Sequence, residues 1–275
     1  MREDSLFYDV MFAKNSRVAK WLLQFFQAEP TWDNLTAVNL KRFNAYLHEH
    51  LSANTVKNYI AELRAVINLY KDQRDIPITD KNMKSVLKTK SVRSTHCYLT
   101  IEELEKFEDL ENLNPTQRDV RDMFLLQAWT GCRLSDAITL TEENISGDML
   151  TYTSQKTQIY ASVPLKPVVR DIISRIPQIK IHNKMTYNRN VHQLCKMAGI
   201  TQPTMVWQSG KKVTEPKCEL ISSHSARRSF ATNLYEAGIE INKISYMMGH
   251  TNTAMTERYI CSNMEMGEEI REFFK

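Results

Sequence analysis

Residues 223–232 have the sequence Ser-His-Ser-Ala-Arg-Arg-Ser-Phe-Ala-Thr, which predicts the first turns of a helix that continues to residue 236. Gly238 is expected to end this helix, because glycine readily adopts the left-handed conformation found after helix C-termini. His224 and Arg227 are three residues apart and therefore share one face of the helix. The stretch thus predicts a helix that presents an imidazole and a guanidinium group side by side.

A second histidine and a tyrosine follow downstream of this helix. A shorter helix is expected over 241–248, and His250 follows it directly after a glycine. Tyr259 lies nine residues after His250, in a helix that either Asn252 or Thr253 caps. The downstream segment therefore adds a second imidazole and a phenol.

A second arginine lies upstream, directly after another predicted helix end. The dipeptide Asn114-Pro115 predicts a helix start, and this helix is expected to end at Gly131. Arg133 then lies at the start of a new helical turn, and Asp136 follows three residues later.

Two arginines, two histidines and a tyrosine form a set that suits a phosphodiester. Guanidinium groups bind the non-bridging oxygens and stabilise the charge added in the transition state. A phenol becomes a nucleophile when its proton is removed and the phosphate charge is neutralised. Taken singly, each residue also has an ordinary explanation, as an ion-pair partner for an arginine or as a core residue for a tyrosine.

The other elements predict a mainly helical fold with one small antiparallel sheet. Residues 149–153 and 159–164 alternate in the manner of strands, and Lys156 lies in the polar turn between them. Residues 89–98 have no apolar periodicity, which indicates a boundary between a helical module and a second, larger domain. The expected domains are 1–92 and 99–275, joined by a linker over 93–98, and the helices expected in the module are about 5–28, 36–51, 52–70 and 80–90.

The composition excludes several classes of protein. The chain has 275 residues, of which 42% are hydrophobic, and its apolar runs are far shorter than the roughly 20 residues that span a bilayer. Five scattered cysteines without a Cys-x-x-Cys motif indicate a reducing cytoplasmic location rather than a disulfide scaffold or a zinc site. No Gly-rich phosphate loop is present, so we expect no nucleotide cofactor. We also expect no metal, because His48 and His50 lie at i and i+2 of a predicted helix and their rings point to different faces.

The charge is segregated along the chain. Residues 1–92 carry 14 basic and 10 acidic groups, whereas residues 102–148 carry 4 basic and 12 acidic groups. Residues 156–228 carry 13 basic and 3 acidic groups, a net charge of +10. This pattern indicates a cationic face that binds a polyanion, although solvated helices explain it equally well at this point.

The ordered set of polar residues resembles the tyrosine recombinases of the phage integrase family over about residues 96–265. Two features depart from the family pattern. Ala226 stands where the family often has leucine, and the 275 residues leave no room for the arm-binding domain of the larger integrases, so we expect either no dependence on arm sites or a trimmed form. The residues that carry the resemblance are Arg133 with Asp136, Lys156, His224, Arg227, His250 and Tyr259.

The resemblance implies a helical core-binding domain followed by an α+β catalytic domain that cuts DNA. Tyr259 would attack a DNA phosphate and leave a 3′-phosphotyrosine and a free 5′-hydroxyl, without a cofactor. The implied roles are phosphate binding for Arg133, Arg227 and His250, proton transfer for Lys156 and His224, and orientation of these side chains for Asp136.

The resemblance also implies partners. We expect double-stranded DNA, a homotetramer on two duplexes, a monomer in free solution, and accessory DNA-bending proteins. The apolar residues of the tail at 264–275 would pack either on a neighbouring subunit or on their own domain. Candidate phosphate contacts in the helical module and linker are Lys57, Arg64, Lys84, Lys88, Lys90 and Arg93.

Three other functions compete with the recombinase. A DNA-binding regulator that no longer cuts needs no tyrosine at this spacing. A type IB topoisomerase-like enzyme would use the same chemistry to nick and close DNA without exchanging strands. An RNA phosphodiesterase is disfavoured, because the carboxylate or paired-histidine set expected for it is missing.

Overall fold

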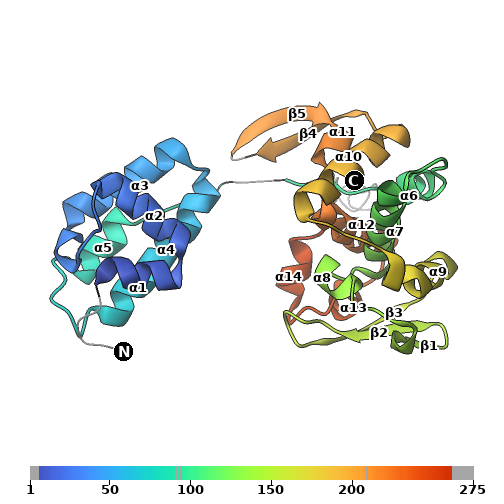
Figure 1. The fold of residues 1–275 in the computed structure, drawn as a ribbon, viewed down its shortest axis with the longest axis horizontal. Helices are drawn as coiled ribbons and strands as arrows, with labels where there is room; N and C mark the ends of the chain where they lie inside the picture. The colour runs from blue at the N-terminus through green and yellow to red at the C-terminus, as the bar shows by residue number, and fades with distance from the viewer. Residues whose placement is uncertain (1–5, 91, 93–94, 209, 262–275) are drawn as a thin grey trace, which may run out of the picture. The chain divides into compact units, whose positions relative to one another are not determined.

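The computed structural model describes residues 6–90, 92, 95–208 and 210–261. Contacts divide the chain into two units (Figure 1). Each unit has its own apolar core. The first unit is Met1–Ser94 with Gln208–Lys211, and the second is Thr95–Trp207 with Lys212–Lys275.

The first unit is a helical bundle built from amphipathic helices. In its longest helix, Val56, Ile60, Leu63 and Ile67 recur at helical spacing and are buried, so one stripe faces the core. The helices of this unit are α1 (Phe7–Lys14), α2 (Ser16–Phe26), η1 (Trp32–Asn34), α3 (Ala37–His50), α4 (Ala53–Tyr70) and α5 (Asp80–Val86).

The single helix expected over 5–28 is wrong, because the chain breaks at Asn15. This residue is extended, with φ of −156°, and its side chain accepts hydrogen bonds from the N–H groups of Arg17 and Val18. An asparagine side chain competes with the backbone for such donors, so it favours a helix start over a helix interior. The result is two helices, α1 and α2, where the apolar spacing predicts one.

The second unit is organised around α7 (Pro115–Thr130), whose part after residue 121 is almost entirely buried. The four consecutive residues 123–126 are at most 1% exposed, a pattern typical of a helix surrounded by others. Helix α7 packs against α9, α10 and α12. The other helices of the unit are α6 (Ile101–Glu108), α8 (Leu134–Ala137), η2 (Glu142–Asn144), α9 (Pro167–Arg175), η3 (Ile176–Gln178), α10 (Lys184–Met197), α11 (Lys217–Leu220), α12 (Ser223–Glu236), α13 (Ile241–Met247) and α14 (Thr253–Glu257).

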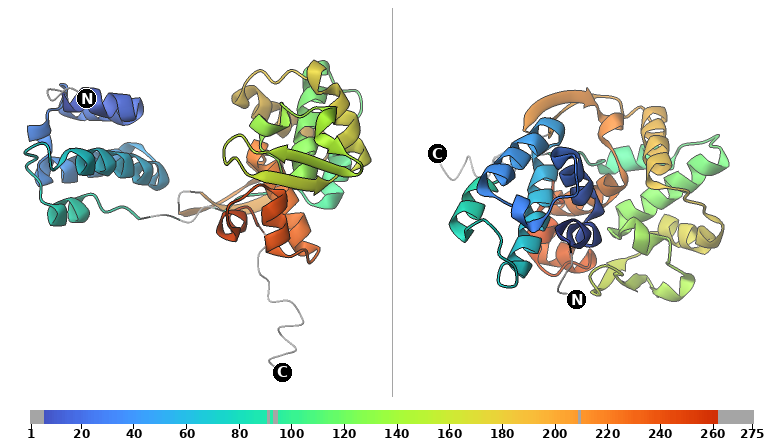
Figure 2. Two further views of the ribbon diagram at one scale, coloured as in Figure 1. Left: turned by 90° about the horizontal axis from the view of Figure 1, so that it is seen from below. Right: turned by 60° about the vertical axis from the view of Figure 1, so that its left-hand side comes forward.

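A three-stranded antiparallel sheet of order β1-β2-β3 covers one side of the second unit, beside α13 (Figures 1 and 2). The strands are β1 (Ile145–Ser146), β2 (Met149–Thr153) and β3 (Tyr160–Pro164). Residues on one face of β2 and β3 are buried and their neighbours are more exposed, as alternation predicts. The turn that joins β2 to β3 carries Lys156.

The mainly helical fold class is confirmed, but the chain forms two small sheets and not one. Strands β4 (Pro203–Gln208) and β5 (Lys211–Pro216) pair with each other, and among their described residues only Val206 is buried. Because this hairpin has no buried face, its sequence lacks the alternation that reveals a half-buried strand.

The described residues contain no candidate membrane span and no candidate metal site. No helix there is long and apolar enough to cross a membrane, and no three histidine, cysteine or acidic side chains gather to hold a metal ion. The expected apolar tail at 264–275 lies outside the described residues.

The turn at Gly131 leads to a prediction about stability. Gly131 has φ of +68°, and an added Cβ would lie within 3.0 Å of three ring carbons of Phe230. Gly147 has nearly the same φ, +62°, but nothing lies within 4 Å of its Cβ position. Gly131→Ala therefore combines left-handed strain with overpacking and should lower the free energy of unfolding by about 3 kcal/mol, against about 1 kcal/mol for Gly147→Ala. Urea denaturation of both variants measures the difference, and equal losses would show that Phe230 does not restrict this turn.

Candidate active site

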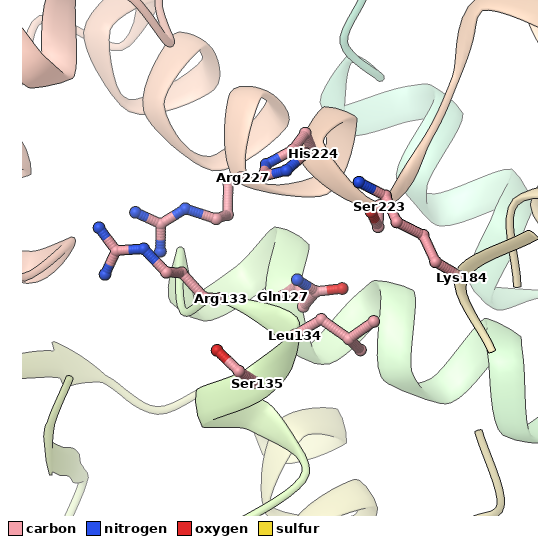
Figure 3. A pocket seen from close by; sticks show the side chains of 8 residues that line it. All are labelled: Gln127, Arg133, Leu134, Ser135, Lys184, Ser223, His224 and Arg227. Carbon is pink, nitrogen blue, oxygen red and sulfur yellow. The ribbon is translucent and has the colours of Figure 1, made fainter. Parts of the chain in front are cut away.

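A pocket of about 210 Å³ lies in the second unit, between α7, α8, α10 and α12. Figure 3 shows the guanidinium groups of Arg133 and Arg227 in the same part of it, with the imidazole of His224 on the neighbouring turn of α12. No acidic residue lines the pocket, so its charge is positive. The lining residues are Gln127, Arg133, Leu134, Ser135, Lys184, Ser223, His224 and Arg227.

Arg227 is a buried cation that has no acidic partner. It is 1% exposed, and no ion pair found among the described residues includes it. Its Nη1 donates to the carbonyl of Gly131 and its Nη2 to His250 Nε2 at 2.8 Å, while its buried Nε has no partner among the described residues. A buried guanidinium with unused donors is suited to an anionic ligand.

His250 supports Arg227 as a neutral acceptor. Because a guanidinium only donates, Nε2 must accept from Arg227, and Nδ1 carries the proton that it donates to Thr256 Oγ1 at 2.9 Å. Burial, followed by the charges of Arg227 and Arg133, lowers the pKa of His250 to about 4. His250 is therefore neutral at pH 7 and fixed in one tautomer.

Arg133 is held by a buried serine and a buried carboxylate. Its Nη1 donates to Ser154 Oγ at 2.7 Å, and Ser154 Oγ donates to Asp136 Oδ2 at 3.2 Å. Asp136, which is 2% exposed, also accepts from the N–H of Gln155 at 3.1 Å. The carboxylate thus connects Arg133 to the start of the turn between β2 and β3. Burial, followed by the charge of Arg227, lowers the pKa of Arg133.

His224 lies on the first turn of α12, where its ring lines the pocket. The residue as a whole is exposed, but desolvation of its ring lowers its pKa, and the charges of Lys184 and Arg227 lower it further. A neutral imidazole at the pocket edge can accept a proton.

Lys156 is exposed and does not line the pocket. The turn that carries it is nevertheless bonded to the site on both sides. The N–H of Gln155 donates to Asp136, and Thr157 Oγ1 donates to the carbonyl of Gly249 at 3.1 Å. The structure therefore fixes the base of this turn and leaves the Lys156 side chain in solvent.

Tyr259 lies beside the arginine and histidine groups. Its ring centroid is 5.3 Å from that of His250, and the guanidinium carbons of Arg227 and Arg228 lie 5.1 and 5.3 Å from the ring. The ring is half-buried against a small apolar cluster that includes Phe230 and Ile244. Of the six predicted catalytic residues, the structure thus brings five together and leaves Lys156 apart.

The predicted DNA contacts of the first unit are less concentrated. Lys88 and Lys90 line a pocket of about 410 Å³ with His48, Ala53, Thr89 and Val92. Lys84 is exposed on α5, Lys57 is exposed on α4, and Arg64 is half-buried there. Arg93 lies outside the described residues.

Several contributors to the site have no signal in the sequence. Ser154 and Thr256 are ordinary hydroxyl residues until the fold places them against Arg133 and His250. Lys184 lines the pocket from α10, 40 residues before His224. Nothing in the sequence distinguishes it from the other lysines of the chain.

The model of the phage integrase family matches residues 97–266. Tyrosine recombinase XerC of Natranaerobius thermophilus is 26% identical over 253 residues, which cover 87% of this chain and 82% of that protein. Tyrosine recombinase XerA of Thermococcus kodakarensis is 24% identical over 246 residues, with the same two coverages.

Solved structures share the fold. XerH site-specific recombinase bound to palindromic difH substrate matches with a TM-score of 0.69 and 19% identity, covering 96% of this chain and 80% of that chain. The Tn1549 transposon integrase in complex with a circular intermediate DNA matches with a TM-score of 0.67 and 17% identity, covering 98% and 100%.

The neutral state of His250 predicts a pH-dependent stability. The folded pKa of about 4 lies below the usual 6.5, so the unfolded chain binds this proton first, and stability falls as pH drops from 6.5 toward 4. Between pH 7 and pH 5 this group should lower the free energy of unfolding by about 2 kcal/mol. His250→Gln, which keeps an acceptor for Arg227 but does not titrate, should lose about 2 kcal/mol less over this interval in urea denaturation. Equal losses in both proteins would contradict a depressed pKa at His250.

Proposed function

The chain belongs to the phage integrase family and is a site-specific recombinase of the tyrosine type, and we propose that it cuts and rejoins DNA through a 3′-phosphotyrosine on Tyr259. The observation that carries this proposal is the position of the Tyr259 ring, 5.1 Å from the guanidinium of Arg227 and 5.3 Å from the ring of His250. A nucleophile beside a buried cation with unused donors suits attack on a phosphodiester.

In the proposed cleavage, the phenol oxygen of Tyr259 attacks phosphorus and the bond to the 5′-oxygen breaks. Arg133 and Arg227 donate to the non-bridging oxygens, and the unused Nε of Arg227 is one donor for this contact. The added charge of the transition state is thereby neutralised inside a pocket without acidic side chains.

Two groups move the protons of the proposed reaction. His224, neutral because its pKa is lowered, accepts the proton of the tyrosine. Lys156 protonates the departing 5′-oxygen, which requires its exposed side chain to reach the bound DNA. Strand joining runs the same steps in reverse, with a 5′-hydroxyl as nucleophile. The phosphotyrosine linkage conserves the energy of the broken phosphodiester bond, so the strand exchange needs no ATP.

The proposed partner is double-stranded DNA. Among the similar structures, the Tn1549 transposon integrase is in complex with a circular intermediate DNA, and XerH is bound to a palindromic difH substrate. Two duplexes with two cuts each require four nucleophiles, so we infer a homotetramer on DNA that forms from free monomers, with DNA-bending proteins as accessory partners. We also infer a cytoplasmic location, which the five cysteines support because none of them forms a disulfide.

Covalent trapping tests the nucleophile. The protein is incubated with nicked duplexes that carry candidate target sites, and the mixture is separated on a denaturing gel. Wild-type protein and Tyr246→Phe, which alters an exposed tyrosine on α13, should give a shifted protein–DNA band, and Tyr259→Phe should give none. Arg227→Ala should form the band about 100–1,000-fold more slowly.

Other outcomes of the trapping assay would separate the alternatives. Tight, salt-sensitive binding without an adduct would favour a DNA-binding regulator that does not cut. Relaxation of a supercoiled plasmid that lacks any target site would favour a type IB topoisomerase-like enzyme.

The basic pocket of the first unit predicts a change in salt dependence. If Lys88 and Lys90 each neutralise one phosphate, Lys88→Gln with Lys90→Gln should reduce the slope of log K against log salt by about 2. Lys71→Gln serves as the control, because Lys71 is already paired with Asp80 at 2.9 Å. Gel-shift titrations measure this slope. They are made at salt concentrations between about 50 and 200 mM, where phosphate contacts change the affinity strongly. An unchanged slope in the double variant would exclude these lysines from the DNA interface.

A further inference from the structure

The segment that carries Tyr259 has little helical support of its own. Helix α14 has five residues and ends at Glu257, so Tyr259 lies beyond its last turn. The N–H of Tyr259 donates to the carbonyl of Thr256 at 2.8 Å, but a helix this short has no independent stability. The position of the phenol therefore depends on contacts from elsewhere in the fold.

Those contacts come from one face of α12. Arg228 Nη1 donates to the carbonyl of Arg258 at 2.6 Å, directly before the tyrosine. Thr232, four residues later on the same face, accepts from the N–H of Cys261 at 3.0 Å and donates to the carbonyl of Tyr259 at 3.4 Å. The backbone on both sides of Tyr259 is thus bonded to the helix that also carries Arg227.

Arg228 differs from the neighbouring Arg227 in what it contacts. It does not line the pocket that contains Arg133, and one of its donors is used on the backbone of the tyrosine segment. Its guanidinium carbon lies 5.3 Å from the Tyr259 ring, and a second contact reaches Cys261 Sγ at 3.9 Å. Its hydrogen bonds are thus with the segment of the nucleophile, while only its charge acts on a group that lines the phosphate pocket, His224.

We propose that Arg228 is a positioning residue for DNA cleavage, which together with Thr232 clamps residues 258–261 so that the Tyr259 phenol faces the scissile phosphate. The proposal rests on the function proposed above and adds a residue to it. An error of about 1 Å in the position of a reacting group costs about 100-fold in rate, so loss of the clamp should slow cleavage without weakening DNA binding.

The experiment compares Arg228→Ala, Arg228→Lys and Lys243→Ala. The lysine variant keeps one donor for the carbonyl of Arg258, and Lys243→Ala removes an exposed charge from α13 as a matched control. Three quantities are measured on full-length protein: adduct formation at saturating DNA, the Kd for the same DNA, and amide hydrogen exchange of residues 253–261 without DNA. Thermal melting checks that each variant is folded.

The clamp predicts that Arg228→Ala forms the adduct about 100-fold more slowly while its Kd stays within about twofold of wild type. Exchange should rise in residues 258–261 and stay unchanged in α7. Arg228→Lys should recover about tenfold of the lost rate, and Lys243→Ala should behave as wild type. An Arg228→Ala protein that cleaves normally would overturn the proposal, and so would one whose Kd rises in step with the lost rate at unchanged exchange, because Arg228 would then bind phosphate.

Hydrogen exchange separates the clamp from the proposed function. If wild-type protein forms no adduct with any DNA, the recombinase chemistry fails, yet exchange in 258–261 still reports on the clamp. Unchanged exchange in Arg228→Ala would overturn the clamp in that case too.

Discussion

The geometry of the site depends on the turn at Gly131. Its positive φ ends α7, its missing side chain lets the ring of Phe230 pack against the backbone, and its carbonyl accepts from Arg227. Arg133 follows two residues later, so a single turn sets the distance between the two guanidinium groups. No side chain other than hydrogen fits this position without displacing Phe230, which lies on the same helix as Arg227.

Carbonyls and neutral side chains hold the cations of the site more than acids do. Arg227 is held by a carbonyl and an imidazole. Among the described residues, the one carboxylate paired with Arg133, that of Asp136, also accepts from Ser154 and from a backbone N–H. A closer carboxylate would cancel the charge that the phosphate needs. Burial first, and the nearby charge of Arg227 second, lower the pKa of Arg133, and a bound anion would offset both effects.

The sequence predicts local features of this fold well and long-range contacts poorly. The start of α7 is predicted by the dipeptide Asn114-Pro115, and the structure places the cap there, with Asn114 and Gln117 bonded within four residues. The break at Asn15 and the β4–β5 hairpin escaped prediction, because a side-chain cap overrode the apolar spacing and the hairpin has no buried face. In the site, the ordered motif predicts the arginine, histidine and tyrosine residues. Only the fold places Ser154 beside Arg133 and Thr256 beside His250.

The site residues are spread along the chain in an order that matters during synthesis. Arg133 emerges first, Arg227 follows 94 residues later, and Tyr259 comes last of the set. Arg227 reaches its bonded position only when α12 has packed on α7, and the tyrosine segment is held only after α12 is in place. A ribosome-bound chain can therefore complete its first unit long before it contains the proposed nucleophile. Under the proposed mechanism, partly synthesised copies that lack Tyr259 are thus unable to cut DNA.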